Sequence, residues 1–266
     1  MSLASDCSLL IVGGGRMGEA LLAGLRAAGR PANELVVVEA AAARRQELET
    51  AHPEVTIAEH VTPCAGAVLA VKPGDVPSAA RAVAQAGVRR VLSVAAGVTT
   101  ATIEAAAGQS VAVVRAMPNT PALIGAGAAA ISPGSHAGEE DMAWATAILG
   151  AVGVVVRVPE IALDAVTGLS GSGPAYLFLV AEAMVDAGVL AGLARDTAET
   201  LTFQTLLGSS RLLIDGGSTP AALRAAVTSP GGTTAAGVRE LERRGVRAAF
   251  LDAVAAAAER SRELGR

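Results

Sequence analysis

The chain has 266 residues, a length that allows one large domain or two of ordinary size. Hydrophobic residues make up 52% of it but aromatic residues only 2%, so the core must be built from small aliphatic side chains. The net charge of −4 and the lack of any basic run argue against a nucleic-acid partner.

The two cysteines, Cys7 and Cys64, have neither CxxC spacing nor a histidine neighbour, so no metal site is expected. Two isolated cysteines fit a reducing cytosol, and a disulfide framework is not expected. The first residues show no signal-peptide pattern. The apolar segment 142–156 is too short to span a bilayer, so we predict a soluble, cytoplasmic protein without a membrane partner.

The N-terminal half begins with the pattern of a dinucleotide-binding fold. A buried strand at 9–12 leads into Gly13-Gly14-Gly15-Arg16-Met17-Gly18, and a helix to about Ala28 and a strand at 35–38 follow. In this context Gly13 permits a tight turn, Gly15 lets the backbone approach a pyrophosphate, and Gly18 lets helix and strand pack closely. The alternative is a glycine-rich turn that binds nothing.

An acidic residue, Glu39, closes the second strand about twenty residues beyond Gly18. A carboxylate at this place can accept a hydrogen bond from the adenosine 2′-hydroxyl of NAD and repels the 2′-phosphate of NADP. Arg44 and Arg45 follow closely. They supply counter-charge to that phosphate or form a solvated helix face, so the choice between NADPH and NADH stays open.

Three further buried strands at 67–71, 91–94 and 111–114 each run into a loop of small, polar or proline residues. Ligands of open α/β sheets bind outside such strand ends. We therefore place Lys72 and Asn119 near the nicotinamide end of the cofactor, against the alternative of a plain loop lysine and a turn asparagine. Two more strands are expected at 128–133 and 152–158, with a helix at 138–149 between them. The three histidines, His52, His60 and His136, lie in no motif, so we do not expect a histidine proton donor.

After Pro159 the pattern becomes helical. Helices are expected at about 161–167, 174–187, 195–214, 220–227, 233–244 and 246–264. The glycine-rich stretch 168–176 is expected to interrupt them, either as a flexible connector or as a closely packed break. The helix from Pro174 is apolar nearly all round, which a domain of about a hundred residues cannot cover alone. This predicts a homodimer through the helical half.

The stretch Ser229-Pro230-Gly231-Gly232-Thr233-Thr234 breaks this helical region. Proline and two glycines favour a loop, and the threonines open a new helix. Free backbone N–H groups, a positive helix end and small hydroxyls suit a small carboxylate. The alternative is an ordinary turn between two helices.

These motifs together resemble the pyrroline-5-carboxylate reductase family. The most specific is Val227–Thr234 with its continuation to Glu242; supporting stretches are 13–18, 70–73, 95–97, 115–121 and 169–176, so the resemblance covers essentially the whole chain. It implies an α/β Rossmann-type N-terminal domain, residues 1–158, followed by an all-α C-terminal dimerisation domain, residues 159–266. It further implies a homodimer, with a ring of dimers in some members.

The resemblance also implies a reaction and a set of site residues. The reaction is reduction of L-1-pyrroline-5-carboxylate to L-proline by NADPH or NADH, the last step of proline biosynthesis. The residues that the resemblance implies for the cofactor are Gly13, Gly14, Gly15, Arg16, Met17, Gly18, Ala70, Val71, Lys72, Pro73, Ala95, Ala96 and Gly97, and the local pattern adds Glu39 and Asn119. Those expected to bind the substrate are Ser229, Gly231, Gly232, Thr233 and Thr234, and the Thr234 hydroxyl is the expected catalytic partner of the imine nitrogen. Glu39 departs from the small polar or basic pattern common at this place in the family, which leaves the cofactor preference open.

Two other functions are compatible with parts of this pattern. Another imine or β-hydroxyacid reductase on the same two-domain plan is the nearer one. Hydroxyacid enzymes of that plan use a lysine in the helical domain, whereas residues 161–266 contain none. The other rival is a dinucleotide-binding sensor or scaffold without turnover, which would not need the 229–234 loop.

Overall fold

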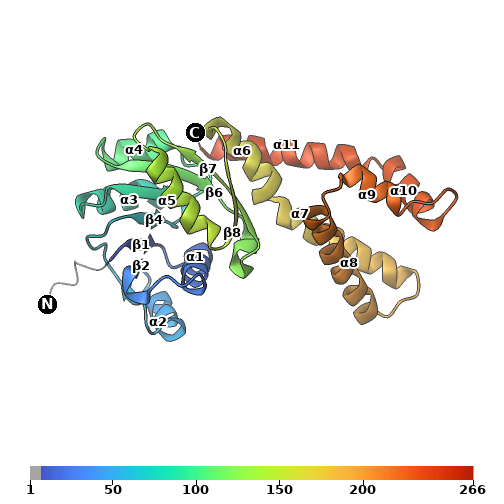
Figure 1. Cartoon of the computed structure of the whole chain (residues 1–266), viewed down its shortest axis with the longest axis horizontal. Coiled ribbons are helices and arrows are strands. Elements are labelled where there is room, and N and C mark those ends of the chain that lie inside the picture. The colour runs from blue at the N-terminus through green and yellow to red at the C-terminus, as the bar shows by residue number, and fades with distance from the viewer. Residues whose placement is uncertain (1–6, 266) are drawn as a thin grey trace. The chain divides into compact units, whose positions relative to one another are not determined.

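The computed structural model describes residues 7–265 and contains two compact units. One comprises residues 7–172 and 255–265, and the other comprises Gly173–Val254. The elements of both units are labelled in Figure 1.

The first unit is built on an eight-stranded sheet. The strands are β1 Leu9–Val12, β2 Leu35–Val38, β3 Thr56–Ala58, β4 Ala67–Leu69, β5 Arg90–Ser93, β6 Ala112–Met117, β7 Gly127–Pro133 and β8 Gly153–Arg157. Their order is β3-β2-β1-β4-β5-β6-β7-β8, and all neighbouring pairs are parallel except β6 and β7. The chain order reverses at β1 and β4, which is the point where open α/β sheets bind ligands. The predicted Rossmann-type α/β fold is confirmed, and β3 is a strand that the sequence pattern did not reveal.

Helices cover both faces of this sheet. They are α1 Arg16–Ala27, α2 Ala42–Ala51, α3 Val76–Gln85, α4 Thr100–Ala107 and α5 Glu139–Gly150. Along β1, Leu9 and Ile11 pack into the core with α1, α2 and α5, whereas Leu10 and Val12 pack into the core with α3 and α4. Successive side chains of a strand point to opposite faces, so a strand buried on both faces reads as an unbroken apolar run. This is why the strand at 9–12 could be recognised in the sequence.

A short helical region follows β8 in the same unit. It consists of α6 Leu163–Val166 and a π-helical turn at Thr167–Gly171. The glycine-rich stretch 168–176 was expected to interrupt the helices. Its residues 168–171 belong to the π-helical turn, so the expected break is wrong for this part of the stretch. Gly171 explains the composition, because a Cβ there would lie 2.5 Å from the terminal methyl group of Met117.

The second unit is entirely helical. Its helices are α7 Gly173–Leu190, α8 Arg195–Asp215, α9 Pro220–Ala226, α10 Thr233–Arg243 and the first part of α11 Val246–Leu264. Each helix predicted between 174 and 264 is present, within a few residues of its expected ends. On α7 and α8 only Ala181, Val185, Ala198 and Thr202 are buried.

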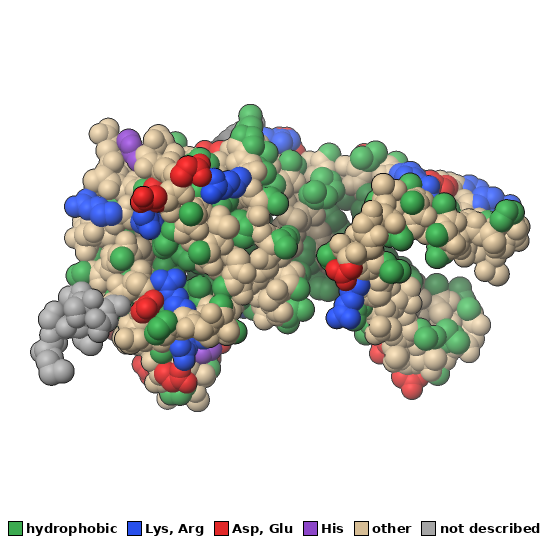
Figure 2. All heavy atoms as spheres, in the orientation of Figure 1, with side chains coloured by type: hydrophobic (Ala, Val, Ile, Leu, Met, Phe, Trp, Pro, Cys, Tyr) green, Lys and Arg blue, Asp and Glu red, His purple; other side chains and the backbone are tan. Residues whose placement is uncertain are grey.

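Much of the apolar surface of these helices is exposed. Phe178 is 65% exposed and Ile214 is 80% exposed, and hydrophobic side chains spread over this unit in Figure 2. Among the described residues, the helical stretch Glu160–Leu190 is long and apolar enough to cross a membrane, and only 11% of its most apolar window is buried. Such a surface requires a cover, which a second protein chain can provide.

Cys7 and Cys64 form a disulfide, with their Cα atoms 5.2 Å apart. The expectation of two isolated cysteines is therefore wrong. Cys7 precedes β1 and Cys64 precedes β4, and these two strands are hydrogen-bonded neighbours. The sheet thus brings together two residues that the sequence separates by 57 positions.

Breaking this disulfide is predicted to lower the stability of the first unit. A bond that closes a long loop restricts the unfolded chain, and its loss typically costs about 2–4 kcal/mol of unfolding free energy. We expect denaturant unfolding, followed by circular dichroism, to shift to lower denaturant when a reductant is added. The Cys7→Ser/Cys64→Ser double variant serves as control and should unfold at one midpoint with or without reductant. A wild-type midpoint that ignores the reductant would contradict the prediction.

Candidate functional site

Two glycines of the loop after β1 are required by close packing within the chain itself. Gly13 has a φ of 104°, and a Cβ there would lie 2.6 Å from the carbonyl oxygen of Ala70, which directly follows the neighbouring strand β4. A Cβ on Gly18 would overlap the carbonyl group of Gly13. These two positions let α1 begin directly over the end of β1.

Gly15 differs, because the chain does not require a glycine there. It is exposed, it caps α1, and a Cβ on it would meet no atom of residues 7–265 within 4 Å. The open space lies beside the first amides of α1, where backbone N–H groups and the helix dipole favour an anion. Close approach of a ligand phosphate to the backbone is the remaining physical reason for a glycine, so the loop fits a dinucleotide.

A groove of about 990 Å³ runs along the carboxyl ends of β1, β2 and β4. It brings together seven residues: Gly13, Gly15, Glu39, Ala70, Val71, Lys72 and His60, of which all but His60 were predicted to bind a cofactor. The position of His60 in the groove was missed, since it follows the strand that the sequence pattern did not reveal. The groove has the volume and location of a nucleotide site at a topological switch point.

The other predicted cofactor residues in this unit lie outside the lining of the groove. Ala95, Ala96 and Gly97 follow β5, where the amide of Ala95 donates to the Ser93 hydroxyl. Asn119 follows β6, and its amide is already in use: Oδ1 accepts from the amide of Ala128 at 2.8 Å, and Nδ2 donates to the carbonyl of Ser170 at 3.1 Å. Asn119 thus holds two neighbouring segments in place.

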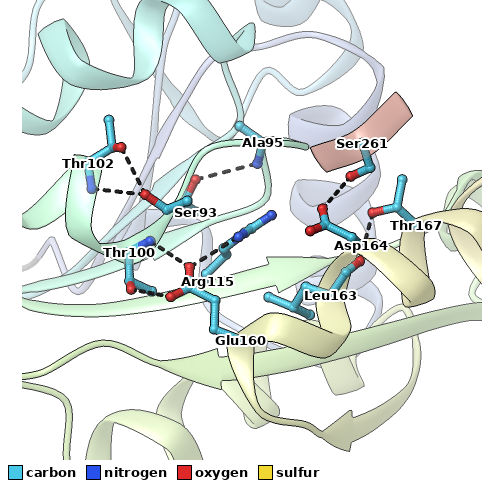
Figure 3. A network of polar contacts seen from close by, with 11 residues as sticks. Ser93, Ala95, Thr100, Thr102, Arg115, Glu160, Leu163, Asp164, Thr167 and Ser261 are labelled. Atoms are coloured by element: carbon cyan, nitrogen blue, oxygen red, sulfur yellow. Dashed lines mark hydrogen bonds and ion pairs between the residues drawn. The ribbon is translucent and has the colours of Figure 1, made fainter. Parts of the chain in front are cut away.

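A partly buried ion pair between Arg115 and Glu160 was not anticipated from the sequence (Figure 3). Arg115 on β6 is 5% exposed, and its guanidinium donates to Glu160 at 3.1 Å. The same carboxylate accepts from the amide and the hydroxyl of Thr100, both at 2.7 Å, at the first turn of α4. Three segments far apart in the chain meet here, which no local pattern could have shown.

The ionisation of Glu160 depends on a balance of opposing effects. Burial by itself disfavours the charged carboxylate, but hydrogen bonds from Thr100 and Arg115 outweigh it and hold the pKa of Glu160 below 4.5. A second link, from the Ser261 hydroxyl to the Asp164 carboxylate at 2.7 Å, ties the end of α11 to α6. Together these contacts fix the start of the helical region next to the strand ends.

The predicted substrate loop lies in the second unit, between α9 and α10. Gly231 has a φ of 69°, and the amide of Gly232 donates to the carbonyl of Ser229 at 3.1 Å. Gly232 caps α10, so Thr233 and Thr234 are its first two residues. Within residues 7–265 the hydroxyls of Ser229, Thr233 and Thr234 take part in no hydrogen bond, and the first amides of α10 point out of the helix end unpaired. The loop therefore offers free donors of the kind that bind a carboxylate.

Two protein-family models match the chain. Residues 160–264 match the model described as pyrroline-5-carboxylate reductase dimerisation, and residues 8–97 match the model described as NADP oxidoreductase, coenzyme F420-dependent. A pyrroline-5-carboxylate reductase of Synechocystis is 45% identical over 263 residues, which cover 96% of this chain and 97% of that protein.

The chain belongs to the pyrroline-5-carboxylate reductase family.

Solved structures agree with this assignment. The pyrroline-5-carboxylate reductase of Coxiella burnetii superposes with a TM-score of 0.92 at 34% identity, covering 98% of this chain and 100% of that one. The pyrroline carboxylate reductase of Plasmodium falciparum, solved with NADP bound, superposes with a TM-score of 0.84 at 27% identity and covers 98% and 99%. The family resemblance predicted from the sequence is confirmed.

The open space at Gly15 generates a prediction about cofactor binding. A Gly15→Ala variant should fold normally, because its methyl group meets nothing in the protein, yet bind a nicotinamide dinucleotide at least about tenfold more weakly. Gly150→Ala is the matched control, since a Cβ there also meets nothing and the residue lies at the end of α5, away from the groove. Calorimetric titration with NADH and with NADPH measures both. Equal affinity in the two variants would remove the glycine loop from the binding site.

The Glu160 network predicts a pH-dependent contribution to stability. The folded pKa of Glu160 lies below its unfolded value near 4.5, so the stabilisation is complete above about pH 4.5 and is lost as the pH falls through the folded pKa. Glu160→Gln should lower the unfolding free energy at pH 7 by about 1–3 kcal/mol, and the difference from wild type should shrink in acid. Glu49→Gln, at an exposed position on α2, is the control. Urea titrations between pH 3 and pH 7 test this, and a difference independent of pH would contradict it.

Proposed function

We propose that this protein reduces L-1-pyrroline-5-carboxylate to L-proline with a nicotinamide dinucleotide as hydride donor, the last step of proline biosynthesis. The observation that carries the proposal is family membership over nearly the whole chain, together with a nucleotide groove and a free anion-binding loop. The substrate is a cyclic imine with one carboxylate. Its reduction requires a bound hydride donor, a site for the carboxylate and a hydrogen-bond partner for nitrogen.

We assign cofactor binding and substrate binding to different halves of the chain. Residues 1–158 form the proposed dinucleotide-binding domain, and residues 159–266 form the proposed substrate-binding and dimerisation domain. Support for this division comes from the match of residues 160–264 to the dimerisation family and from the end of β8 at Arg157. The cofactor, when bound, supplies the hydride. The proposed cofactor-binding residues are those predicted from the sequence, with the Asn119 amide acting through the segments that it holds.

The 229–234 loop is the proposed substrate site. Free amides at the start of α10 and the positive end of its dipole suit the carboxylate of the substrate. Thr234 is half-buried, and its hydroxyl is not engaged by any other residue between 7 and 265. We assign this hydroxyl to the imine nitrogen as an orienting hydrogen-bond partner, with the proton coming from water or from an already protonated substrate.

A direct assay tests the function. Purified protein is mixed with pyrroline-5-carboxylate and either NADPH or NADH, and cofactor oxidation is followed by absorbance at micromolar enzyme. Substrate-dependent oxidation with proline as product is expected. If neither cofactor is oxidised while both bind, the protein is a dinucleotide-binding sensor. Oxidation with other cyclic imines but not with this one would identify a different imine reductase.

The proposed assembly is a homodimer through the helical half, which the dimerisation family and the exposed apolar surface of α7 and α8 support. A ring of dimers is the proposed larger form, and light scattering of the purified protein distinguishes the two masses. We propose no nucleic-acid or membrane partner and assign the exposed face of Glu160–Leu190 to the partner subunit. A cytoplasmic location is proposed because the relatives are biosynthetic enzymes, whereas the cysteines give it no support.

Replacing Thr234 is predicted to impair turnover but not folding. Loss of one oriented hydrogen bond costs about 1–3 kcal/mol, so Thr234→Ala should lower kcat/KM for the imine at least about tenfold. Thr200→Ala on α8 is the matched control, because its hydroxyl donates only to the carbonyl of Asp196 within its own helix. Steady-state kinetics, with cofactor affinity measured in parallel, provide the test. Near-normal turnover of the Thr234 variant would exclude the residue from the mechanism.

A further inference from the structure

We propose that the ribose end of the groove selects NADH over NADPH, and that Glu39 is the residue that determines this specificity. The inference rests on the proposed function, since it concerns the cofactor of the same site. It departs from the Plasmodium relative, whose structure has NADP bound. The charged groups that determine the choice lie at the carboxyl ends of β2 and β3.

The Glu39 carboxylate is fixed at the end of β2. Its Oε2 accepts from the amide of Gly14 and its Oε1 accepts from the amide of Ala41, both at 2.9 Å. The first contact connects the acid directly to the glycine loop, and Glu39 also lines the groove. An ionised carboxylate has further lone pairs on both oxygens, so it can still accept from a ribose hydroxyl. A phosphate in the same place has no proton to donate and carries like charge.

Arg44 is not available as a counter-charge for a 2′-phosphate. Its guanidinium donates to the carbonyl of Gly14 at 2.8 Å, to Glu47 at 2.7 Å and to Glu19 at 2.5 Å. Two carboxylates therefore already balance this single positive charge. The arrangement supports the glycine loop from outside the groove, which Arg44 does not line.

Arg45 is engaged in a similar way. It donates to the carbonyls of Glu39 and Ala40 at 2.9 and 2.7 Å, and it forms an ion pair with Glu59 at 3.1 Å. Its side chain is 19% exposed. Glu59 directly follows β3, the strand paired with β2, so this acid lies at the same sheet edge as Glu39 and also lines the groove.

The charges at this edge therefore favour an uncharged ribose. Arg44 and Arg45 contact three carboxylates, those of Glu19, Glu47 and Glu59. The Glu39 carboxylate, held by the amides of Gly14 and Ala41, adds a fourth negative charge at the same edge, so these residues carry more negative than positive charge before any ligand binds. Lys72, the single lysine of the sequence, lines the groove after β4, on the other side of β1 from Glu39. Lys72 therefore lies on the side of the groove away from the ribose end. Among the described residues that line the groove, Lys72 is the one lysine or arginine, so a 2′-phosphate at the ribose end would meet Glu39 and Glu59.

The test compares the two cofactors in binding and in turnover. Calorimetric titration with NADH and NADPH is paired with kcat/KM for each cofactor at saturating pyrroline-5-carboxylate. Wild type is expected to favour NADH at least about tenfold in both measurements. Glu39→Gln should reduce that ratio at least about tenfold, chiefly through tighter NADPH binding, and Glu59→Gln should reduce it less while releasing Arg45. Glu49→Gln, an exposed acid on the same helix as Arg44, is the control and should keep the wild-type ratio.

The outcomes separate this inference from the proposed function. Equal or tighter binding of NADPH by wild type overturns it, as does an unchanged ratio in Glu39→Gln. A preference for NADH in binding without any turnover leaves it standing while refuting the reductase activity. Raising the salt concentration should weaken the wild-type discrimination, because exposed charges are screened within about 8–10 Å. Discrimination that salt does not affect would point to shape in place of charge and would overturn the role given to Glu39.

Discussion

The close approach of α1 to the end of β1 is the constraint on which the nucleotide site depends. Gly18 lies against the carbonyl group of Gly13, and Gly13 lies against the carbonyl of Ala70, the residue that follows β4. No side chain fits at either contact, so both glycines are required by the backbone itself. The consequence is a helix that begins beside the two strands where the chain order reverses, with Gly13 and Gly15 of the loop lining the groove. Glu39 then reinforces the loop by accepting a hydrogen bond from Gly14.

The second unit shows a different physical situation. Its helices could be predicted from the sequence, yet they bury few of their own apolar side chains. Local helix propensity and the hydrophobic pattern therefore determine the elements, whereas the stability of the unit requires a partner surface. The apolar stretch Glu160–Leu190 has the length and hydropathy of a membrane span, and the same composition suits a helix that packs against a partner chain. Charged residues at its start, Glu160 and Asp164, are held by contacts in the sheet unit and fix one end of the stretch to protein.

Much of the fold was predictable because it depends on local signals. Unbroken apolar runs marked the central strands, and glycine or proline residues marked most helix ends. The features that were not predicted depend on contacts that the sheet creates between distant parts of the chain. β3 is short and only half-buried, so its run is not apolar enough to recognise. The Cys7–Cys64 bond follows from the pairing of β1 with β4, and the Arg115–Glu160 pair follows from β6 meeting the helical region. The stretch 168–176 was misjudged because glycines and serines are typical of connectors, although close packing needs the same small residues.

The role of the arginine pair after β2 could not be predicted from the local sequence. Sequence gives the number and order of charges near the ribose, and on that basis two arginines could neutralise a 2′-phosphate. The effect of a charge depends on which groups already balance it. Glu19 comes from α1, Glu47 from the following turn of α2, and Glu59 from the end of β3, so the acids that occupy the arginines come from three elements. Their arrangement around the sheet edge neutralises both arginines. The negative charge of Glu39 then dominates the proposed ribose site.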